Sequence, residues 1–400
     1  MSLYEACKSG NLEQVKEILK DSKIDINEGN KQETPFAIAC FKGHIDIIKY
    51  MLNDKRLDVN KADKYGETPF FTVCNMGFLN IVKCMMENER IDFNKANKSR
   101  ETPFYIACKS GNFELVKYMM MMNKKIDLNK TDKNGYTPFA ITINTLKYTL
   151  NDQIDNNRLA IYKNCPLGAK VFNEYIDIIK YMMQDKRIDL NKSDNCGCTP
   201  FFIACDMGYL NIVKLMMENE RIDFNKANDD EETPFYTACK NCHFELIKYM
   251  MSTKKIDLNK ANENGDTPFA TLCQYDELND NQECLEIIKY MILDGRIDIH
   301  KKNENEETAF DIVCKSDEPN IVKYFLLSNR YRLHTKNLEI NNYSDEINEL
   351  INEYNIDSVH FEKKYRKKLN IKNMNKNCLF LLNCADGDID YIKKIFKKKI

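Results

Sequence analysis

The stretch GETPFFTVCNMGFLNIVK, residues 66–83, decides the fold of this 400-residue chain. Thr68-Pro69-Phe70 is a helix-start signal. The threonine side chain caps a free backbone N–H group, and proline at the first helical position lacks a donor that would have no partner there. A short apolar run follows, and Gly77 can take the left-handed conformation that ends a helix. The apolar positions that come next, including Ile81 and Val82, predict a second helix.

The same signal recurs along the chain, mostly every 34 or 35 residues, which indicates stacked repeats rather than separate globular domains. Successive copies are joined by an Ile-Asp-hydrophobic-Asn-Lys segment, such as Ile126–Lys130, and a polar turn, such as Asp132–Gly135. Alternation followed by Asn-Gly predicts a hairpin. The seven Thr-Pro-Phe copies begin at Thr34, Thr68, Thr102, Thr137, Thr199, Thr233 and Thr267, and worn copies occur at Pro166 and Thr308.

Helix, turn, helix and hairpin at this period resemble the ankyrin repeat. The matching residues are Gly66–Phe70, Gly43-His44 and Ile81–Lys83, and the resemblance covers residues 1–327 well and the remainder loosely. It implies an all-α ankyrin-repeat solenoid of stacked helix-turn-helix units with short β-hairpin tips. It also implies a role in protein interaction, because a stack of small units offers a long concave face and no deep pocket.

The register predicts about twelve units, but the 62 residues from Thr137 to Thr199 allow two interpretations. Either a 28-residue loop is inserted between two helices, or a shortened repeat is followed by a unit that starts near Pro166. We favour the second, because residues 44–71 match residues 175–202 at 19 of 28 positions, as a tandem duplication of a four-repeat block would. The expected domains are a capping repeat at 1–33, four-repeat blocks at 34–164 and 165–298, a further repeat at 299–341, and degenerate repeats with a basic cap at 342–400. A smaller insertion, Tyr275–Asn281, follows the last unit of the second block.

Composition and charge argue against several classes of function. The chain has 59 Lys and Arg against 61 Asp and Glu, which argues against a general polyanion binder. It has no apolar run long enough for a membrane span. Sixteen cysteines without an export signal indicate reduced thiols and a cytoplasmic location. Residues 361–400 are basic, and Lys363–Lys368 resembles a nuclear-import or polyanion patch. Nucleic-acid binding would be confined to this end, and a wettable cap is the interpretation we favour.

No constellation of catalytic or cofactor-binding residues emerges. Cys239–His243 matches the haem-attachment pattern, but Cys239 occupies a small-residue packing position that nine repeats fill with cysteine, and Cys242 replaces the helix-ending glycine. Cys196 and Cys198 supply only two of the four ligands of a zinc site. The recurring Ile-Asp-x-Asn-Lys carboxylates favour hydrogen bonding within turns. We therefore expect no enzyme, cofactor, metal or small-molecule substrate.

The tips are where residues vary beyond structural need, and their charge changes from basic to acidic along the chain. This change is either neutral drift of solvated turns or a gradient that orients an unidentified protein partner. The candidate tip residues are Lys31, Lys64, Tyr65, Lys98, Arg100, Lys133 and Tyr136, then Asp229, Asp230, Glu263, Asp266 and Glu304. Four aromatic candidates, for which inter-repeat packing is the favoured role, are Phe71, Tyr105, Phe202 and Tyr236. The alternative function is a substrate-recruiting or regulatory subunit of an enzyme system such as a ubiquitin ligase, which would need a recruiting motif within residues 328–376.

Overall fold

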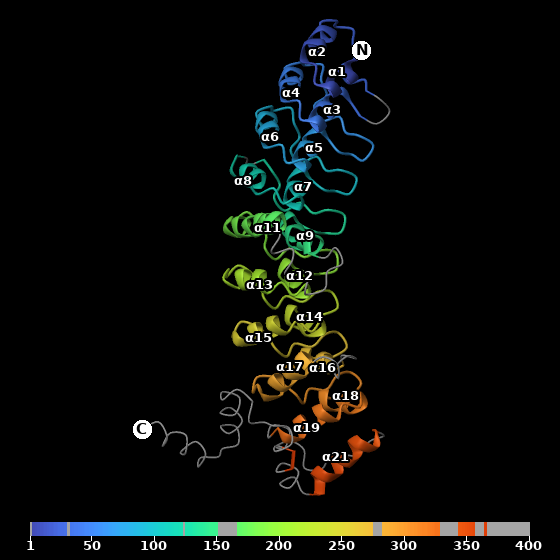
Figure 1. The fold of residues 1–400 in the computed structure, drawn as a ribbon, viewed down its shortest axis with the longest axis vertical. Helices are drawn as coiled ribbons and strands as arrows, with labels where there is room; N and C mark the ends of the chain where they lie inside the picture. The colour runs from blue at the N-terminus through green and yellow to red at the C-terminus, as the bar shows by residue number, and fades with distance from the viewer. Residues whose placement is uncertain are drawn as a thin grey trace, which may run out of the picture. The chain divides into compact units, whose positions relative to one another are not determined.

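The computed structural model describes residues 2–29, 33–122, 125–150, 166–274, 282–328, 343–356 and 364–365. Every regular element within these ranges is a helix (Figure 1). The chain forms two compact units. Unit 1 comprises residues 1–204 and 214–223, and unit 2 comprises residues 205–213 and 224–400.

Unit 1 is built from helix pairs in which each first helix packs on the first helix of the next pair. The pairs are α1 (Leu3–Ser9) with α2 (Leu12–Leu19), α3 (Pro35–Lys42) with α4 (Ile45–Leu52), α5 (Pro69–Asn75) with α6 (Leu79–Met86), α7 (Pro103–Lys109) with α8 (Phe113–Met122), and α9 (Pro138–Leu150) with α11 (Pro166–Gln184). The pair α12 (Pro200–Asp206) and α13 (Leu210–Met217) contains the division between the two units.

Unit 2 continues the same pattern of helix pairs. Its pairs are α14 (Pro234–Lys240) with α15 (Phe244–Ser252), α16 (Pro268–Cys273) with α17 (Gln282–Leu293), and α18 (Ala309–Lys315) with α19 (Pro319–Leu327). A single helix, α21 (Asp345–Ile356), then packs on α19.

The predicted helix signals are confirmed at atomic detail. The Thr68 hydroxyl accepts a hydrogen bond from the Phe71 backbone N–H at 3.1 Å, and Pro69 is the first residue of α5. Phe70 and Cys74 are fully buried, so the apolar run of the first helix forms the core between pairs. Gly77 has a φ of 72°, the left-handed conformation expected at the turn into the second helix.

The predicted β-hairpins are tight turns instead, and no strand occurs in the described ranges. In the turn 63–67, the Asp63 carboxylate accepts the N–H groups of Tyr65 (2.8 Å) and Glu67 (2.9 Å), and Gly66 has a φ of 82°. The next turn bonds to this one through the Lys98 N–H, which donates to the Tyr65 carbonyl at 2.9 Å. One such bond between successive turns is too short a ladder to form a strand, which explains the difference from the sequence pattern.

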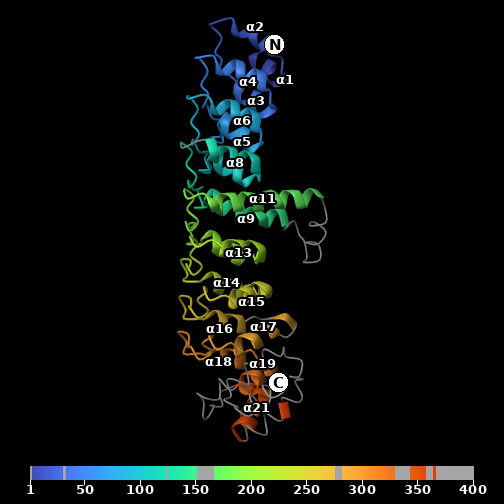
Figure 2. The same cartoon turned by 90° about the vertical axis from the view of Figure 1, so that its left-hand side faces the viewer.

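Residues 137–198 form one repeat with an insertion between its helices, so the favoured prediction of a shortened repeat at 137–164, followed by a new unit that starts near Pro166, is wrong. The Tyr175 hydroxyl donates to the Lys109 carbonyl at 2.7 Å and faces Gly111 of the preceding repeat, as His44 faces Gly10. The second half of α11 therefore serves as the second helix that pairs with α9. Figure 2 shows α9 and α11 side by side, extended beyond the neighbouring helices of unit 1.

The single repeat at 137–198 lowers the number of repeats below the predicted number and shortens the predicted duplicated block. Nine helix pairs lie within the described ranges, and the residues of the matched segments are three repeats apart rather than four. Both insertions, the one before Tyr175 and Tyr275–Asn281, fall between the two helices of a repeat. Residues 366–400, which belong to the degenerate repeats and basic cap predicted at 342–400, lie outside the described residues.

Candidate partner-binding surface

An asparagine at the base of each turn joins successive repeats. The Asn60 amide donates to the Arg90 carbonyl at 2.7 Å, and its oxygen accepts the Asp92 N–H at 2.9 Å. The Ile-Asp-x-Asn-Lys carboxylates make turn hydrogen bonds, as predicted: Asp58 accepts the Asn60 N–H at 3.0 Å. The same two-bond asparagine contact is made by Asn27, Asn60, Asn94, Asn129, Asn191, Asn225 and Asn259.

The arginine that directly precedes this Ile-Asp-x-Asn-Lys segment caps the second helix of the preceding repeat. The Arg90 guanidinium donates to the Leu52 carbonyl at 2.7 Å, which the end of α4 leaves without a helical partner, and to the Leu57 carbonyl of the following loop at 3.0 Å. In the repeat before it, Arg56 pairs with Asp54 at 2.7 Å, and hydrogen bonds from this guanidinium lower the pKa of the Asp54 carboxyl. These polar groups therefore hold the stack together and are not available to a partner.

The basic tip residues of unit 1 point outward. Lys64, Lys98, Arg100 and Lys133 are exposed, and Arg100 takes a φ of 64° at the glycine position of its turn. Tyr65 is 58% exposed, and the Lys64 ammonium lies 4.9 Å from its ring centre. Tyr136 is half-buried beside Asp194, and burial raises the pKa of its hydroxyl to about 12. Lys31 lies outside the described residues.

The acids at the ends of the turns face inward instead. Glu101 is paired with Lys109 at 2.9 Å and also accepts a hydrogen bond from Asn97. Glu232 is paired with Lys240 at 2.6 Å, and Glu307 with Lys315. The exposed charge of each tip is therefore set by its middle residues. The sequence contains the signal for these pairs, a glutamate directly before a cap threonine with a lysine eight residues after the glutamate, which occurs three times.

The middle residues of the unit 2 tips are acidic. Asp229, Asp230, Glu263 and Glu304 are exposed, and Asp266 is half-buried and accepts a hydrogen bond from Asn303 at 2.9 Å. The three turns 228–232, 262–266 and 303–307 contain no lysine or arginine. Their nine acidic residues are Asp229, Asp230, Glu231, Glu232, Glu263, Asp266, Glu304, Glu306 and Glu307.

The four aromatic candidates are buried, which removes them from the partner-binding surface. Phe71 and Tyr105 are 1% exposed, and Phe202 and Tyr236 are 5% and 4% exposed. The Tyr105 hydroxyl donates to the Asp132 carboxylate at 3.0 Å, and burial raises the pKa of this hydroxyl far above its usual value. The interpretation of these residues as exposed anchors is wrong, because their side chains are buried. Inter-repeat packing is their role.

The family models agree with this repeat geometry. A family model described as ankyrin repeats (3 copies) matches residues 3–97, 55–132, 72–158 and 139–228, and a second, described as ankyrin repeat, matches residues 230–260. The chain belongs to the ankyrin-repeat family. A solved structure described as EF0377, an ankyrin repeat protein, is 24% identical, covers 55% of this chain and 97% of its own, and has a TM-score of 0.44. A search of curated proteins found no match.

Two exposed apolar residues on ankyrin first helices were not indicated by the sequence pattern. Phe41 and Met76 are each 43% exposed at the carboxyl ends of α3 and α5, which pack side by side. Phe41 directly follows the buried Cys40, whereas Met76 lies two residues after the buried Cys74 and just past the end of α5, so both positions lie where the chain turns away from the core. Together with Tyr65 they add apolar contact area to the unit 1 surface.

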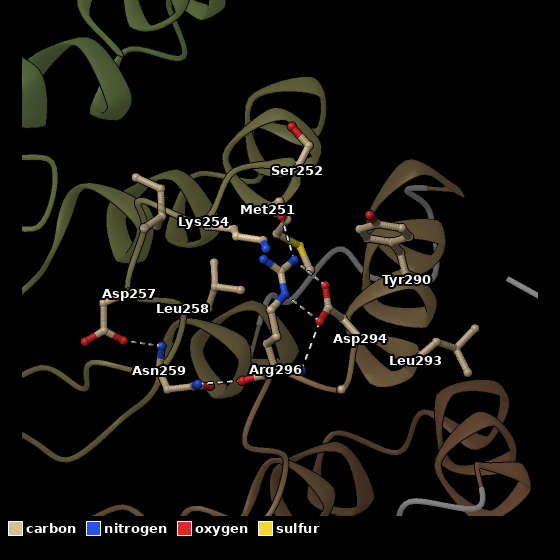
Figure 3. A pocket seen from close by; sticks show the side chains of 12 residues that line it. Met251, Ser252, Lys254, Asp257, Leu258, Asn259, Tyr290, Leu293, Asp294 and Arg296 are labelled. Carbon is tan, nitrogen blue, oxygen red and sulfur yellow. Dashed lines mark hydrogen bonds and ion pairs between the residues drawn. The ribbon is translucent and has the colours of Figure 1, made fainter. Parts of the chain in front are cut away.

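The grooves between ankyrin repeats hold structural groups. A groove of about 680 Å³ lies between the second-helix ends of two unit 2 repeats, with Tyr290 and Leu293 on one wall and Met251 on the other (Figure 3). Its Arg296 guanidinium is engaged by Asp294 at 2.7 Å and by the Met251 carbonyl at 2.5 Å. A groove of about 440 Å³ around Arg221 is its counterpart in unit 1. Both arise from the arginine contacts that cap the helices.

The candidate cofactor motifs do not form binding sites. Cys239 is fully buried, and the His243 ring nitrogen lies 2.8 Å from the Asp206 carbonyl, so the haem-attachment pattern is an accident of repeat register. Among the described residues, no group of three or more His, Cys, Asp or Glu could hold a metal ion, and Cys196 and Cys198 gain no third ligand. The helices that the structure describes include none with the length and hydropathy needed to cross a membrane.

Little of the basic carboxyl end is described. Of residues 361–400, the structure describes Lys364 and Tyr365. The Lys364 ammonium lies 2.8 Å from both carboxylate oxygens of Glu353, and the Tyr365 hydroxyl donates to the same group at 3.1 Å. These two residues are thus engaged by α21 of their own chain.

Proposed function

We propose that this chain is a non-catalytic scaffold that binds a protein partner through its turn tips and first helices. Ankyrin repeats are general protein-interaction modules, and they are typically non-catalytic. The observation that carries the proposal is the division of labour within each turn. The residues at the two ends of the turn are bonded within the stack, whereas the middle residues are exposed and differ between repeats.

The charge of these exposed residues supports a directional partner. Unit 1 presents lysine and arginine at three turns, together with the exposed apolar residues Tyr65, Phe41 and Met76. Unit 2 presents only acidic charge at its three turns. A partner segment whose basic part meets unit 2 would associate faster than a neutral one, because complementary fields steer the encounter. The proposal therefore includes a basic partner segment for unit 2.

Affinity capture or proximity labelling in the native cell identifies the partner, and charge reversal then tests the surface. Replacing Asp229, Asp230, Glu263 and Glu304 by lysine should lower the association rate by about tenfold or more at low salt, and the difference should shrink at high salt. The matched control is lysine at Glu245 and Glu286, which are exposed on second helices of the same unit. An unchanged association rate with unchanged salt dependence would contradict the role of the tips.

The ligase-subunit alternative is tested by the same capture with residues 1–327 and the full chain. Loss of a ligase subunit from the shorter chain would favour that alternative. Within residues 328–376, the described part consists of Ser328, residues 343–356 and residues 364–365, and α21 in that part packs on α19. This packing gives no specific support for a recruiting motif.

A further inference from the structure

A recurrent contact joins the ends of several first helices to the next repeat. A residue in the left-handed conformation faces the residue at the start of the following second helix. A Cβ placed on Gly208 would lie 2.7 Å from the His243 ring. One placed on Gly77 would lie 3.9 Å from the Cβ of Asn112. The Cβ atoms at the two positions of this contact therefore lie within van der Waals distance of one another.

In unit 2 this contact is made by two cysteines. Cys242 stands in the glycine position and keeps the left-handed conformation, with a φ of 52° that side chains rarely adopt. The opposing position is Cys284, because the segment 284–290 (CLEIIKY) aligns with 44–50 (HIDIIKY), whose His44 faces Gly10. The sequence thus places a thiol on each side of one repeat interface.

The environment of the two thiols agrees with this placement. Cys284 is fully buried and Cys242 is half-buried, and neither cysteine forms a disulfide in the structure. A hydrogen bond between the two thiols, together with burial, raises the pKa of Cys242 far above its usual value. Nearby Cys239 and Cys273 are fully buried, which leaves Cys242 as the thiol of this group that a small reagent can reach first.

We propose that Cys242 and Cys284 form a reversible disulfide that crosslinks two neighbouring repeats of unit 2 when the chain meets a small disulfide such as oxidised glutathione. A disulfide needs Cβ atoms about 3.5–4.5 Å apart. The separation of 3.9 Å at the equivalent contact of Gly77 with Asn112 meets this condition.

The chemistry is two successive thiol–disulfide exchanges. The Cys242 thiolate attacks one sulfur of oxidised glutathione, forming a mixed disulfide and releasing one glutathione thiolate. The Cys284 thiolate then attacks the Cys242 sulfur and releases the second glutathione. Two protein thiols are oxidised and one glutathione disulfide is reduced to two thiols, with the protons passing to solvent and the leaving thiolates. Because the pKa of Cys242 is raised, the thiolate is scarce near neutral pH, and the rate should increase as the pH rises.

The crosslink would fix the two repeats whose turns are 262–266 and 303–307, both part of the acidic surface. It closes a loop from residue 242 to residue 284, which reduces the conformational freedom of the unfolded chain. The oxidised unit 2 should therefore be more resistant to unfolding than the reduced one, and the bond would be reversed by a dithiol reductant.

The test is to oxidise the full chain with excess oxidised glutathione over a series of pH values and to map disulfides by mass spectrometry without reduction. The expected product joins the tryptic peptides 241–248 and 261–289, with the bond assigned to Cys284 rather than Cys273 by fragmentation. The oxidised chain should melt about 5–10 °C higher than the reduced chain. Failure of this linked peptide to form, or its formation through Cys273, would overturn the proposal.

Two variants guard against misfolding and nonspecific oxidation. Cys242→Gly restores the residue that other repeats carry, so it should fold, and it should lose both the linked peptide and the change in melting temperature. The double variant Gly77→Cys and Asn112→Cys transfers the pair to unit 1 and should form the equivalent link. If the Cys242→Gly variant gains the same thermal shift on oxidation, the crosslink lies elsewhere and the proposal is wrong.

Discussion

A single planar amide gives each repeat a fixed position on the next. In the Asn60 contact, the side-chain nitrogen donates to a carbonyl of the following repeat, and the side-chain oxygen accepts a hydrogen bond from an N–H group of that repeat. Aspartate lacks the donor and alanine lacks both groups, so asparagine is the residue that satisfies this pair of backbone atoms. The contact recurs in both units, and it explains why the Ile-Asp-x-Asn segment varies less than the tips that follow it.

Replacing Asn60 by alanine should lower the free energy of unfolding by about 1–2 kcal/mol, because two hydrogen bonds between repeats are lost. Urea unfolding followed by circular dichroism measures the change. Asn53→Ala is the matched control, since the Asn53 amide donates only to the Lys49 carbonyl at the end of its own helix, at 3.1 Å. Equal effects of the two variants would mean that the contact between repeats contributes nothing beyond an ordinary surface hydrogen bond.

At the scale of the element, local chemistry predicts the first helices well. The Thr-Pro-Phe cap and the helix-ending glycine act within one turn of the chain, so their structural effect can be read from adjacent residues. The insertion could not be assigned in this way. Cys165-Pro166-Leu167 imitates a cap, whereas the position of the second helix depends on Tyr175 reaching Lys109, 66 residues away. The burial of Phe71 and Tyr105 likewise depends on the neighbouring repeat.

The candidate surface was predicted in outline and not in detail. The exposed positions of Lys64 and Asp229 follow from their place in a polar turn. The inward position of Glu101 was not predicted, although its spacing of eight residues from Lys109 in the following helix is visible in the sequence. It also did not indicate Phe41 and Met76, because exposure at the end of a first helix depends on the direction in which successive helices stack.

Deleting residues 146–173 and replacing Glu174 by glycine joins α9 to the second half of α11 with the spacing of an ordinary repeat. The variant should fold cooperatively with a free energy of unfolding within about 2 kcal/mol of the full chain, because Tyr175 and its contacts are kept and a long connection is removed.

The control for this deletion has the same length and the same register. Deleting residues 148–175 leaves Leu146 and Lys147 in place of the glycine and Tyr175. This chain should be about 1–2 kcal/mol less stable than the first variant, since leucine must adopt a left-handed conformation and the bond to Lys109 is lost. If the first deletion unfolds residues 102–136, the inserted segment is an essential part of the stack and the single-repeat interpretation fails.

The whole chain consists of two compact units built from related repeats. In repeat proteins each repeat contacts only its neighbouring repeats, so the free energy of unfolding is a sum of contributions from the repeats and from the interfaces between them. A local change therefore acts over a short distance along the chain. The tips follow the same division, with exposed basic residues in unit 1 and exposed acidic residues in unit 2. The exposed charge of the tips thus differs between the two units.

A pair of equivalent core substitutions tests this independence. Phe70 in unit 1 and Phe269 in unit 2 are both fully buried, and both belong to a Thr-Pro-Phe cap. The ring centre of Phe70 lies 5.2 Å from that of Phe93, which it meets edge-on, and the ring centre of Phe269 lies 5.9 Å from that of Phe325. Replacing either by leucine should cost about 1–2 kcal/mol. Hydrogen exchange followed by mass spectrometry should show faster exchange in unit 1 for Phe70→Leu and in unit 2 for Phe269→Leu. Equal acceleration across both units in both variants would instead show that the chain unfolds as one cooperative body.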